Sequence, residues 1–295
     1  MSKVYFKGLG VALITPFSDN NSIDFDALSR LVEYQLANGT DYLVALGTTA
    51  ETPTLSKKEK AEVVRCIVNQ TKGRVPVVMG VGGNNTAELV EELKHGDFTG
   101  VSGILSVTPY YNKPTGEGLF QHYKALSSHS PLPIILYNVP GRTGVNMTAE
   151  TTLRIARECP NVVAVKEASG DLNQIKAIIE AAPDGFHVIS GDDGITTSVI
   201  EEGGIGVISV FANAFPKEMS WLVKSALSGD VVNARREMEA NYNRLFHLMF
   251  VEGNPSGVKC MLHLKGMIAN CLRLPLVPVS ESTHQEIKEE LARFG

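Results

Sequence analysis

The chain has 295 residues, 43% of them hydrophobic and 20% charged, which is typical of a globular enzyme and excludes a disordered or fibrous chain. The formal net charge of −5 disfavours a nucleic-acid partner, which would require a basic excess. No segment has the roughly 18 uncharged apolar residues of a membrane-spanning helix, and residues 1–7 lack a secretory signal. Because the 4 cysteines are scattered without a paired motif, we expect reduced thiols in a cytoplasmic protein.

Short runs of β-branched and other apolar residues recur along the first two thirds of the chain. They cover residues 10–14, 42–46, 75–79, 103–107, 133–137, 162–166, 187–190 and 206–210. Their nearly continuous apolar character is typical of strands buried on both faces, as in a parallel sheet.

Helical patterns lie between these runs. The first pattern places five apolar residues on one face: Phe25, Leu28, Leu31, Val32 and Leu36. Gly39 is its expected stop, and Ser56 with Glu59 forms a capping box that begins the next helix. We expect three later helices to begin at threonine N-caps, namely Thr86, Thr115 and Thr148.

Strand-plus-helix units of roughly 30 residues fill about the first 228 residues. Eight such units favour an α/β fold of the closed (β/α)8, or TIM, barrel type over an open doubly wound sheet. The alternative is a Rossmann fold, but its G-x-G-x-x-G fingerprint is incomplete, since Asn85 stands at the third glycine position of residues 80–85. Dinucleotide binding is therefore disfavoured.

The strand pattern stops after residue 229. Apolar residues from Met238 to Met249 predict one long amphipathic helix, another helix is expected over 259–269, and Thr283 is the expected cap of the last. No low-complexity linker precedes these helices. We therefore divide the chain into a barrel that carries the active site (1–229) and an all-helical extension packed on it (230–295).

Active sites of such barrels lie at the carboxyl ends of the strands, and Lys166 ends one of the apolar runs. Period-two alternation places Val162, Ala164 and Lys166 on one face of that strand. If that face points into the barrel, desolvation lowers the pKa of the lysine and yields an amine suited to attack a carbonyl. By position alone, an equally good alternative is that Lys166 extends to water or pairs with Glu167.

Other polar residues end neighbouring runs. Tyr137 is a candidate proton carrier, although a core tyrosine bonded to backbone is the commoner case. Thr48 and Thr49 offer hydroxyls that hold a carboxylate or pass a proton, although taken alone they are better explained as an ordinary turn. Arg142 is either a bidentate clamp for a substrate carboxylate or a solvated surface residue.

Metal chemistry is disfavoured. Asp192 and Asp193 follow Gly191, but the 7 histidines show no H-x-H or H-E-x-x-H spacing, and no third carboxylate is near. Neither a G-x-S-x-G elbow nor a Walker sequence is present. We expect catalysis without a metal or a separate cofactor.

Five motifs in this order and spacing carry a resemblance to a known family. They are GTTAE at 47–51, VTPYYNKP at 107–114, YNVPGRTG at 137–144, KEASGD at 166–171 and SGDD at 190–193. Together they make the chain resemble the dihydrodipicolinate synthase family of the N-acetylneuraminate lyase superfamily, from Gly8 into the C-terminal helices.

The resemblance implies a lyase reaction, the first committed step of diaminopimelate and L-lysine biosynthesis. Lys166 would form a Schiff base with pyruvate, and loss of a methyl proton would give an enamine. The enamine would attack the aldehyde of L-aspartate-4-semialdehyde, and transimination would then close the ring and free Lys166. No cofactor is implied beyond this covalent imine.

The resemblance also implies a role for each matching residue. Tyr137, Thr48 and Tyr111 would form a proton relay, with Tyr111 donated across an interface of a homotetramer built as a dimer of dimers. Thr48 and Thr49 would hold the pyruvate carboxylate, and Arg142 the semialdehyde carboxylate. Backbone contacts near the imine would come from two further positions, Gly191 and Ile208.

This sequence departs from the family pattern at Ala50, which replaces the usual glycine after Thr-Thr. The family's inhibitory L-lysine site would correspond to Thr52, Lys57, Lys60, Asn84, Glu88 and Tyr110. Members inhibited by L-lysine carry histidines where this chain has Lys57 and Lys60. A lysine side chain would repel the ammonium of the ligand, so we expect weak or absent feedback inhibition.

Two other functions compete with this prediction. One is a different pyruvate-dependent class I aldolase of the superfamily, an N-acetylneuraminate or keto-deoxy-sugar lyase, which would need groups that recognise a polyol. Arg142 and the tyrosines Tyr110 and Tyr111 favour a short carboxylate-bearing substrate instead. The other is a non-catalytic barrel that senses a small molecule, which has no need of a reactive lysine.

Overall fold

The computed structural model describes residues 6–294, so most of the N-terminal segment in which we expect no secretory signal lies outside the described part. Eight parallel strands form a closed barrel in sequence order, because the first strand pairs with both the second and the eighth. They are β1 (Gly8–Ala12), β2 (Tyr42–Ala45), β3 (Val77–Gly80), β4 (Gly103–Val107), β5 (Ile134–Asn138), β6 (Val162–Glu167), β7 (His187–Ser190) and β8 (Gly206–Ser209). The barrel prediction is confirmed; of the strands, β1 lies two residues earlier than expected, and β3 begins two residues later than expected.

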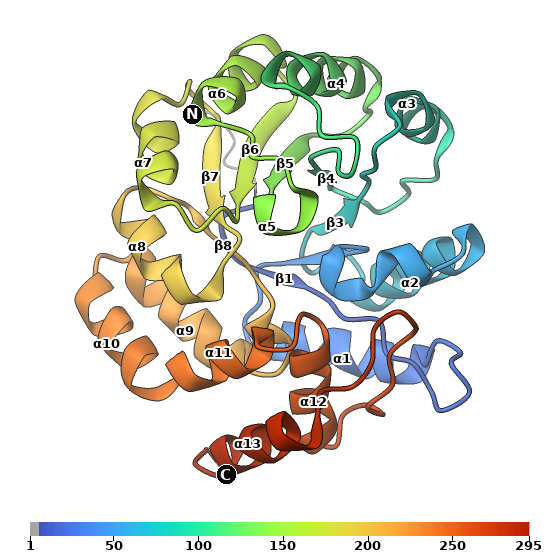
Figure 1. Cartoon of the computed structure of the whole chain (residues 1–295), viewed down its shortest axis with the longest axis vertical. Helices are drawn as coiled ribbons and strands as arrows, with labels where there is room; N and C mark the ends of the chain where they lie inside the picture. The colour runs from blue at the N-terminus through green and yellow to red at the C-terminus, as the bar shows by residue number, and fades with distance from the viewer. Residues whose placement is uncertain (1–5, 295) are drawn as a thin grey trace.

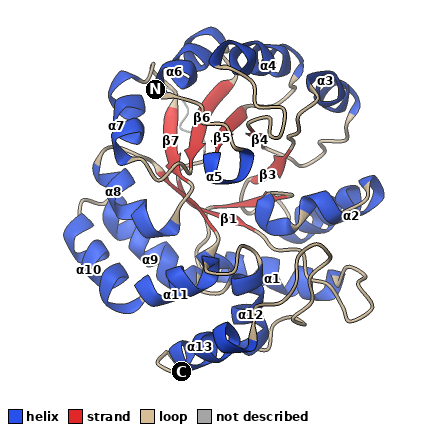
Figure 2. Ribbon diagram, viewed as in Figure 1, coloured by secondary structure: helices blue, strands red, loops and turns tan. Residues whose placement is uncertain are grey.

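Helices surround the strands on the outside (Figures 1 and 2). Those of the barrel are α1 (Phe25–Ala37), α2 (Lys57–Thr71), α3 (Thr86–His95), α4 (Gly116–His129), α5 (Pro140–Thr143), α6 (Ala149–Glu158), α7 (Leu172–Ala181), α8 (Thr196–Glu201) and α9 (Pro216–Leu227). The C-terminal helices are α10 (Val231–Asn241), α11 (Asn243–Phe250), α12 (Ser256–Leu264) and α13 (Glu281–Leu291). In the described part of the chain, no helix is both long and apolar enough to cross a membrane.

The C-terminal helices pack on the barrel rather than standing apart. Figure 1 shows α11 to α13 beside α1, at the end of the molecule away from α4 and α6. Leu245 and Met249 of α11 and Leu262 of α12 are fully buried, in one apolar cluster with Leu28 and Leu31 of α1. This shared core holds the C-terminal helices against the barrel.

The strand alternation around Lys166 differs from the prediction. Ile134 pairs with Val162 and Ile135 with Ala164, so Val163 is an extra residue in β6. Such a bulge turns the preceding side chain to the other face. Val162 therefore packs outward between barrel and helices, whereas Val163 and Ala164 belong to the cluster inside the barrel. The prediction that Val162 shares a face with Lys166 is wrong, although that for Ala164 is confirmed.

Several helix ends also differ from prediction. Ser56, Thr115 and Thr148 cap their helices as expected. Thr86, however, is the first residue of α3, because the side chain of Asn85 accepts a hydrogen bond from the amide of Ala87 and caps the helix.

In the extension, the predicted long helix is two helices, α10 and α11, that meet at Tyr242, where the backbone leaves helical geometry at φ −120°. The ring of Tyr242 stacks on that of Phe294, which anchors the break. The helix predicted over 259–269 ends at Leu264, ahead of Gly266 at φ +71°. Ser280, whose side chain accepts from the amide of Thr283, is the cap of α13 in place of Thr283.

Candidate active site

Lys166 lies at the carboxyl end of β6 and is only 4% exposed. The strand register pairs it directly with Tyr137 at the end of β5. Its Nζ lies 4.3 Å from the centroid of the Tyr137 ring. The side chain therefore does not reach out to solvent, which resolves one of the two alternatives left open by the sequence.

The adjacent acid, Glu167, has other partners. Its carboxylate accepts hydrogen bonds from Asn138 Nδ2 at 3.1 Å, Gln174 Nε2 at 3.0 Å and the amide of Ser169 at 2.7 Å. Within residues 6–294, no ion pair joins it to Lys166. The amine of Lys166 is thus buried without a carboxylate partner in the described part of the chain.

A short 3-10 turn, Thr48–Ala50, follows β2 and presents its two threonines differently. Thr48 is half-buried and lines a cavity, whereas Thr49 is buried and its Oγ1 lies 3.0 Å from Asn254 Nδ2 of the extension. Ala50 is 2% exposed, and its carbonyl accepts a hydrogen bond from Thr15 Oγ1 at 2.8 Å. The alanine is therefore accommodated within the turn, and both hydroxyls stay in place.

That cavity, of about 350 Å³, opens above the carboxyl ends of β2 to β5. Thr48, Tyr137, Arg142 and Tyr110 are among its lining residues. Lys166 does not line the cavity, but its Nζ contacts the ring of Tyr137, which does line it. The cavity thus brings together hydroxyl groups and a guanidinium, and one of its lining side chains, Tyr137, contacts the buried amine.

Two more predicted site residues lie close to Lys166 or inside the barrel. A Cβ placed on Gly191 would come within 3.1 Å of Lys166 Cε, so this glycine leaves room for the lysine side chain. Ile208 of β8 is fully buried in the same interior cluster as Tyr137 and Ala164.

Arg142 and Tyr111 are the exposed members of the predicted set. Arg142 stands on the short helix α5, and its Nη2 donates a 3.4 Å hydrogen bond to the carbonyl of Asn254. Tyr111 is 89% exposed with φ +72°, and it does not line the cavity. A single chain therefore brings Thr48, Tyr137 and Lys166 together but leaves Tyr111 outside.

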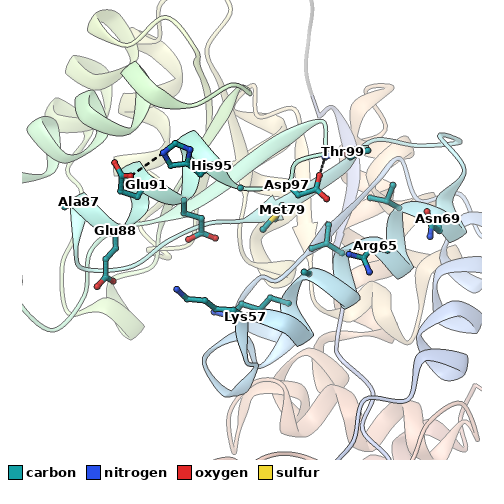
Figure 3. A pocket seen from close by; sticks show the side chains of 16 residues that line it. Lys57, Arg65, Asn69, Met79, Ala87, Glu88, Glu91, His95, Asp97 and Thr99 are labelled. Atoms are coloured by element: carbon teal, nitrogen blue, oxygen red, sulfur yellow. Dashed lines mark hydrogen bonds and ion pairs between the residues drawn. The ribbon is translucent and has the colours of Figure 1, made fainter.

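A second hollow, of about 1020 Å³, lies between α2 and α3. Figure 3 shows Lys57 of α2 and Glu88 of α3 on opposite walls of it. Of the other predicted regulatory residues, Thr52 and Tyr110 line the smaller cavity, and Asn84 Nδ2 donates to the carbonyl of Tyr110 at 3.1 Å. Lys60 lines both, so the two spaces adjoin.

Sequence reasoning missed a buried ion pair next to the turn. Lys259 Nζ of α12 lies 2.5 Å from Glu51 Oε1, and both side chains are fully buried. The signal was available, since Lys259 is the one charged residue in the apolar stretch 257–262. Its partner, however, is more than 200 positions away in the chain, and spacing cannot reveal such a contact.

Comparisons with known proteins agree on one family. The model of the "Dihydrodipicolinate synthetase family" matches residues 5–293. A 4-hydroxy-tetrahydrodipicolinate synthase of Parabacteroides distasonis is 57% identical over 100% of this chain and 99% of its own length. One from Phocaeicola vulgatus is 55% identical over 98% and 97%. The crystal structure of dihydrodipicolinate synthase from Thermotoga maritima matches with a TM-score of 0.94 at 44% identity, covering 98% of both chains.

Proposed function

Since this chain belongs to the dihydrodipicolinate synthetase family, we infer that it is a lyase that condenses pyruvate with L-aspartate-4-semialdehyde, the first committed step of diaminopimelate and L-lysine biosynthesis. One observation carries the proposal for its mechanism. Lys166 is buried against Tyr137 and lacks a carboxylate partner within residues 6–294. An amine held there is the type of nucleophile that forms a Schiff base with a ketone substrate.

The first half of the proposed reaction takes place at Lys166. Its Nζ attacks the carbonyl carbon of pyruvate, and loss of water from the carbinolamine gives the imine. The imine then loses a methyl proton and becomes the enamine nucleophile. Tyr137 is the proposed carrier of these protons because its ring contacts Nζ. Thr48, which lines the same cavity, is the proposed next member of the relay.

The second half joins the enamine carbon to the aldehyde carbon of the semialdehyde, whose amine then displaces Lys166 by transimination. Arg142 is the proposed clamp for its carboxylate, since it is exposed at the cavity and offers a bidentate donor. Thr48 and Thr49 are proposed to hold the pyruvate carboxylate. The reaction needs no group beyond the covalent imine.

Assembly and regulation are also parts of the proposal. Tyr111 is 89% exposed, which suits a residue that completes the relay in a neighbouring subunit of a homotetramer. Residues 1–229 would carry the chemistry and 230–295 would support them. We propose that the enzyme is cytoplasmic, as the scattered cysteines indicate. Lys57 and Lys60 add two positive charges beside the hollow, so weak feedback by L-lysine is proposed.

Steady-state turnover tests the function. Wild type, Lys166→Ala and a control, Lys176→Ala on the exposed side of α7, are assayed with pyruvate and L-aspartate-4-semialdehyde. We expect full activity in the control and a loss of at least about 10³-fold in Lys166→Ala. If the wild-type enzyme does not turn over the semialdehyde but cleaves N-acetylneuraminate or a keto-deoxy sugar, the proposed function is wrong. The protein would then be another aldolase of the superfamily.

A further inference from the structure

Glu51, which directly follows the Thr48–Ala50 turn, has an unusual backbone conformation and buried contacts that the sequence did not predict. Its φ is +53°, in the left-handed region, where residues other than glycine are uncommon. Its side chain is fully buried. Conformations of this kind persist only where the surrounding structure imposes them, so the contacts of Glu51 decide how the turn is positioned.

Those contacts come from the C-terminal extension. Lys259 Nζ lies 2.5 Å from Glu51 Oε1, and the amide of Arg273 donates to Glu51 Oε2 at 2.9 Å. Lys259 Nζ also donates to the carbonyl of Cys271 at 2.9 Å and lies 4.2 Å from the centroid of the Phe17 ring. The two charges therefore face each other inside the protein, where both side chains are fully buried.

A second contact reaches the same turn two residues earlier. Asn254 is 7% exposed, and its Nδ2 lies 3.0 Å from Thr49 Oγ1. Its backbone carbonyl accepts the 3.4 Å hydrogen bond from Arg142. One residue of the extension thus touches the turn that is proposed to bind pyruvate and the arginine that is proposed to bind the second substrate.

We propose that the extension positions the Thr48–Ala50 turn for pyruvate through two buried contacts, Glu51–Lys259 and Thr49–Asn254, which makes Lys259 and Asn254 positioning residues. This inference rests on the proposed function. Net stability is a poor reason for the ion pair, because apolar residues of similar volume often replace buried pairs at no cost. Its fixed geometry serves the turn instead, since the two contacts hold Thr49 and Glu51, which follow Thr48, and Thr48 lines the cavity.

The decisive variant is the double substitution Glu51→Gln with Lys259→Met. It removes both buried charges together, and methionine retains the length of the lysine stem beside Phe17. Lys265→Met, at the end of the same helix α12, is the matched control. Melting temperature, kcat and KM for each substrate are measured for wild type, control and double variant.

We expect the double variant to melt within a few degrees of wild type while its KM for pyruvate rises roughly tenfold, the effect of losing one well-placed hydrogen bond to a charged group. Its KM for the semialdehyde should stay within about twofold, because Arg142 contacts Asn254 and not Lys259. Wild-type stability together with wild-type KM for pyruvate would overturn the proposal. If the double variant does not fold, Asn254→Ala is tested instead, because this substitution leaves no buried charge without a partner. It must show the same rise in KM for pyruvate, and an unchanged KM overturns the proposal.

Failure of the underlying function would look different. In that case the wild-type enzyme itself would show no turnover of pyruvate with the semialdehyde. Normal wild-type turnover with unaltered variants would remove only the positioning role.

Discussion

Gly191→Ala is the substitution whose effect follows most directly from the geometry around Lys166. The new Cβ would lie 2.6 Å from the Cβ of Ala168, 3.0 Å from the carbonyl oxygen of Glu167 and 3.1 Å from Lys166 Cε. Carbon atoms in contact prefer about 3.5–4.0 Å. The end of β6 and the lysine side chain must therefore give way by about 0.5–1 Å.

The size of the effect can be estimated from this overlap. Overpacking of this kind costs about 1–3 kcal/mol, or roughly 2–10 °C in melting temperature for a chain of this size. A misplacement near 1 Å of a reacting group costs about 10²-fold in rate. We therefore expect Gly191→Ala to fold with a slightly lower melting temperature and to lose about 30–100-fold in kcat/KM for pyruvate.

The assay is steady-state turnover, with thermal melts on the same preparations. Gly194→Ala is the matched control, because its Cβ would meet only the Oδ1 atom of Asp192 at 3.4 Å, an ordinary contact. It should retain activity. If Gly191→Ala turns over pyruvate like wild type, or if the control loses as much, the proposed placement of Lys166 beside Gly191 is refuted.

Three further predictions concern the proton relay, pH and regulation. Tyr137→Phe keeps the ring beside Lys166 but removes the hydroxyl, so kcat should fall at least about 10²-fold without a change in melting temperature above a few degrees; unchanged kcat would contradict the relay. Burial lowers the pKa of His122 from 6.5 to about 4, so the unfolded chain binds its proton first as pH falls. The contribution of His122 to the free energy of unfolding is therefore full above about pH 6.5 and is lost as pH falls toward 4. The loss should be about 2 kcal/mol at pH 5, and denaturant titrations of the wild type measure it. His122→Asn should lack this loss and His129→Asn, on the same helix, should retain it; equal pH dependence in both would refute the assignment. Lastly, turnover should change less than about twofold in millimolar L-lysine, and strong inhibition would contradict the effect assigned to Lys57 and Lys60.

The sequence predicted the features that depend on local pattern and strand order. Eight apolar runs were enough to predict a closed barrel, in which the neighbouring runs that end at Tyr137 and Lys166 become adjacent, paired strands. The register confirms that pairing residue for residue. The bulge at Val163 escaped prediction because one extra residue in a strand leaves the apolar run unchanged.

Contacts between segments that are distant in the chain could not be predicted from the sequence, for a different reason. Helical periodicity continues across Tyr242, and the break there is seen only in the backbone, where φ is −120°. Nothing near Glu51 in the sequence indicates that its charge is met by Lys259, because the partner is brought in by the fold. Tyr111 is proposed to contact another subunit. Within this chain its side chain is exposed, so its partners there are not given by the fold of one chain.

The most direct test of the central claim is to trap the imine. The enzyme is incubated with pyruvate, reduced with borohydride and digested, and the modified peptide is located by mass spectrometry. We expect a single pyruvate-derived adduct on Lys166, and none in Lys166→Ala. An adduct on another lysine, or no adduct in an enzyme that still turns over pyruvate, would contradict it.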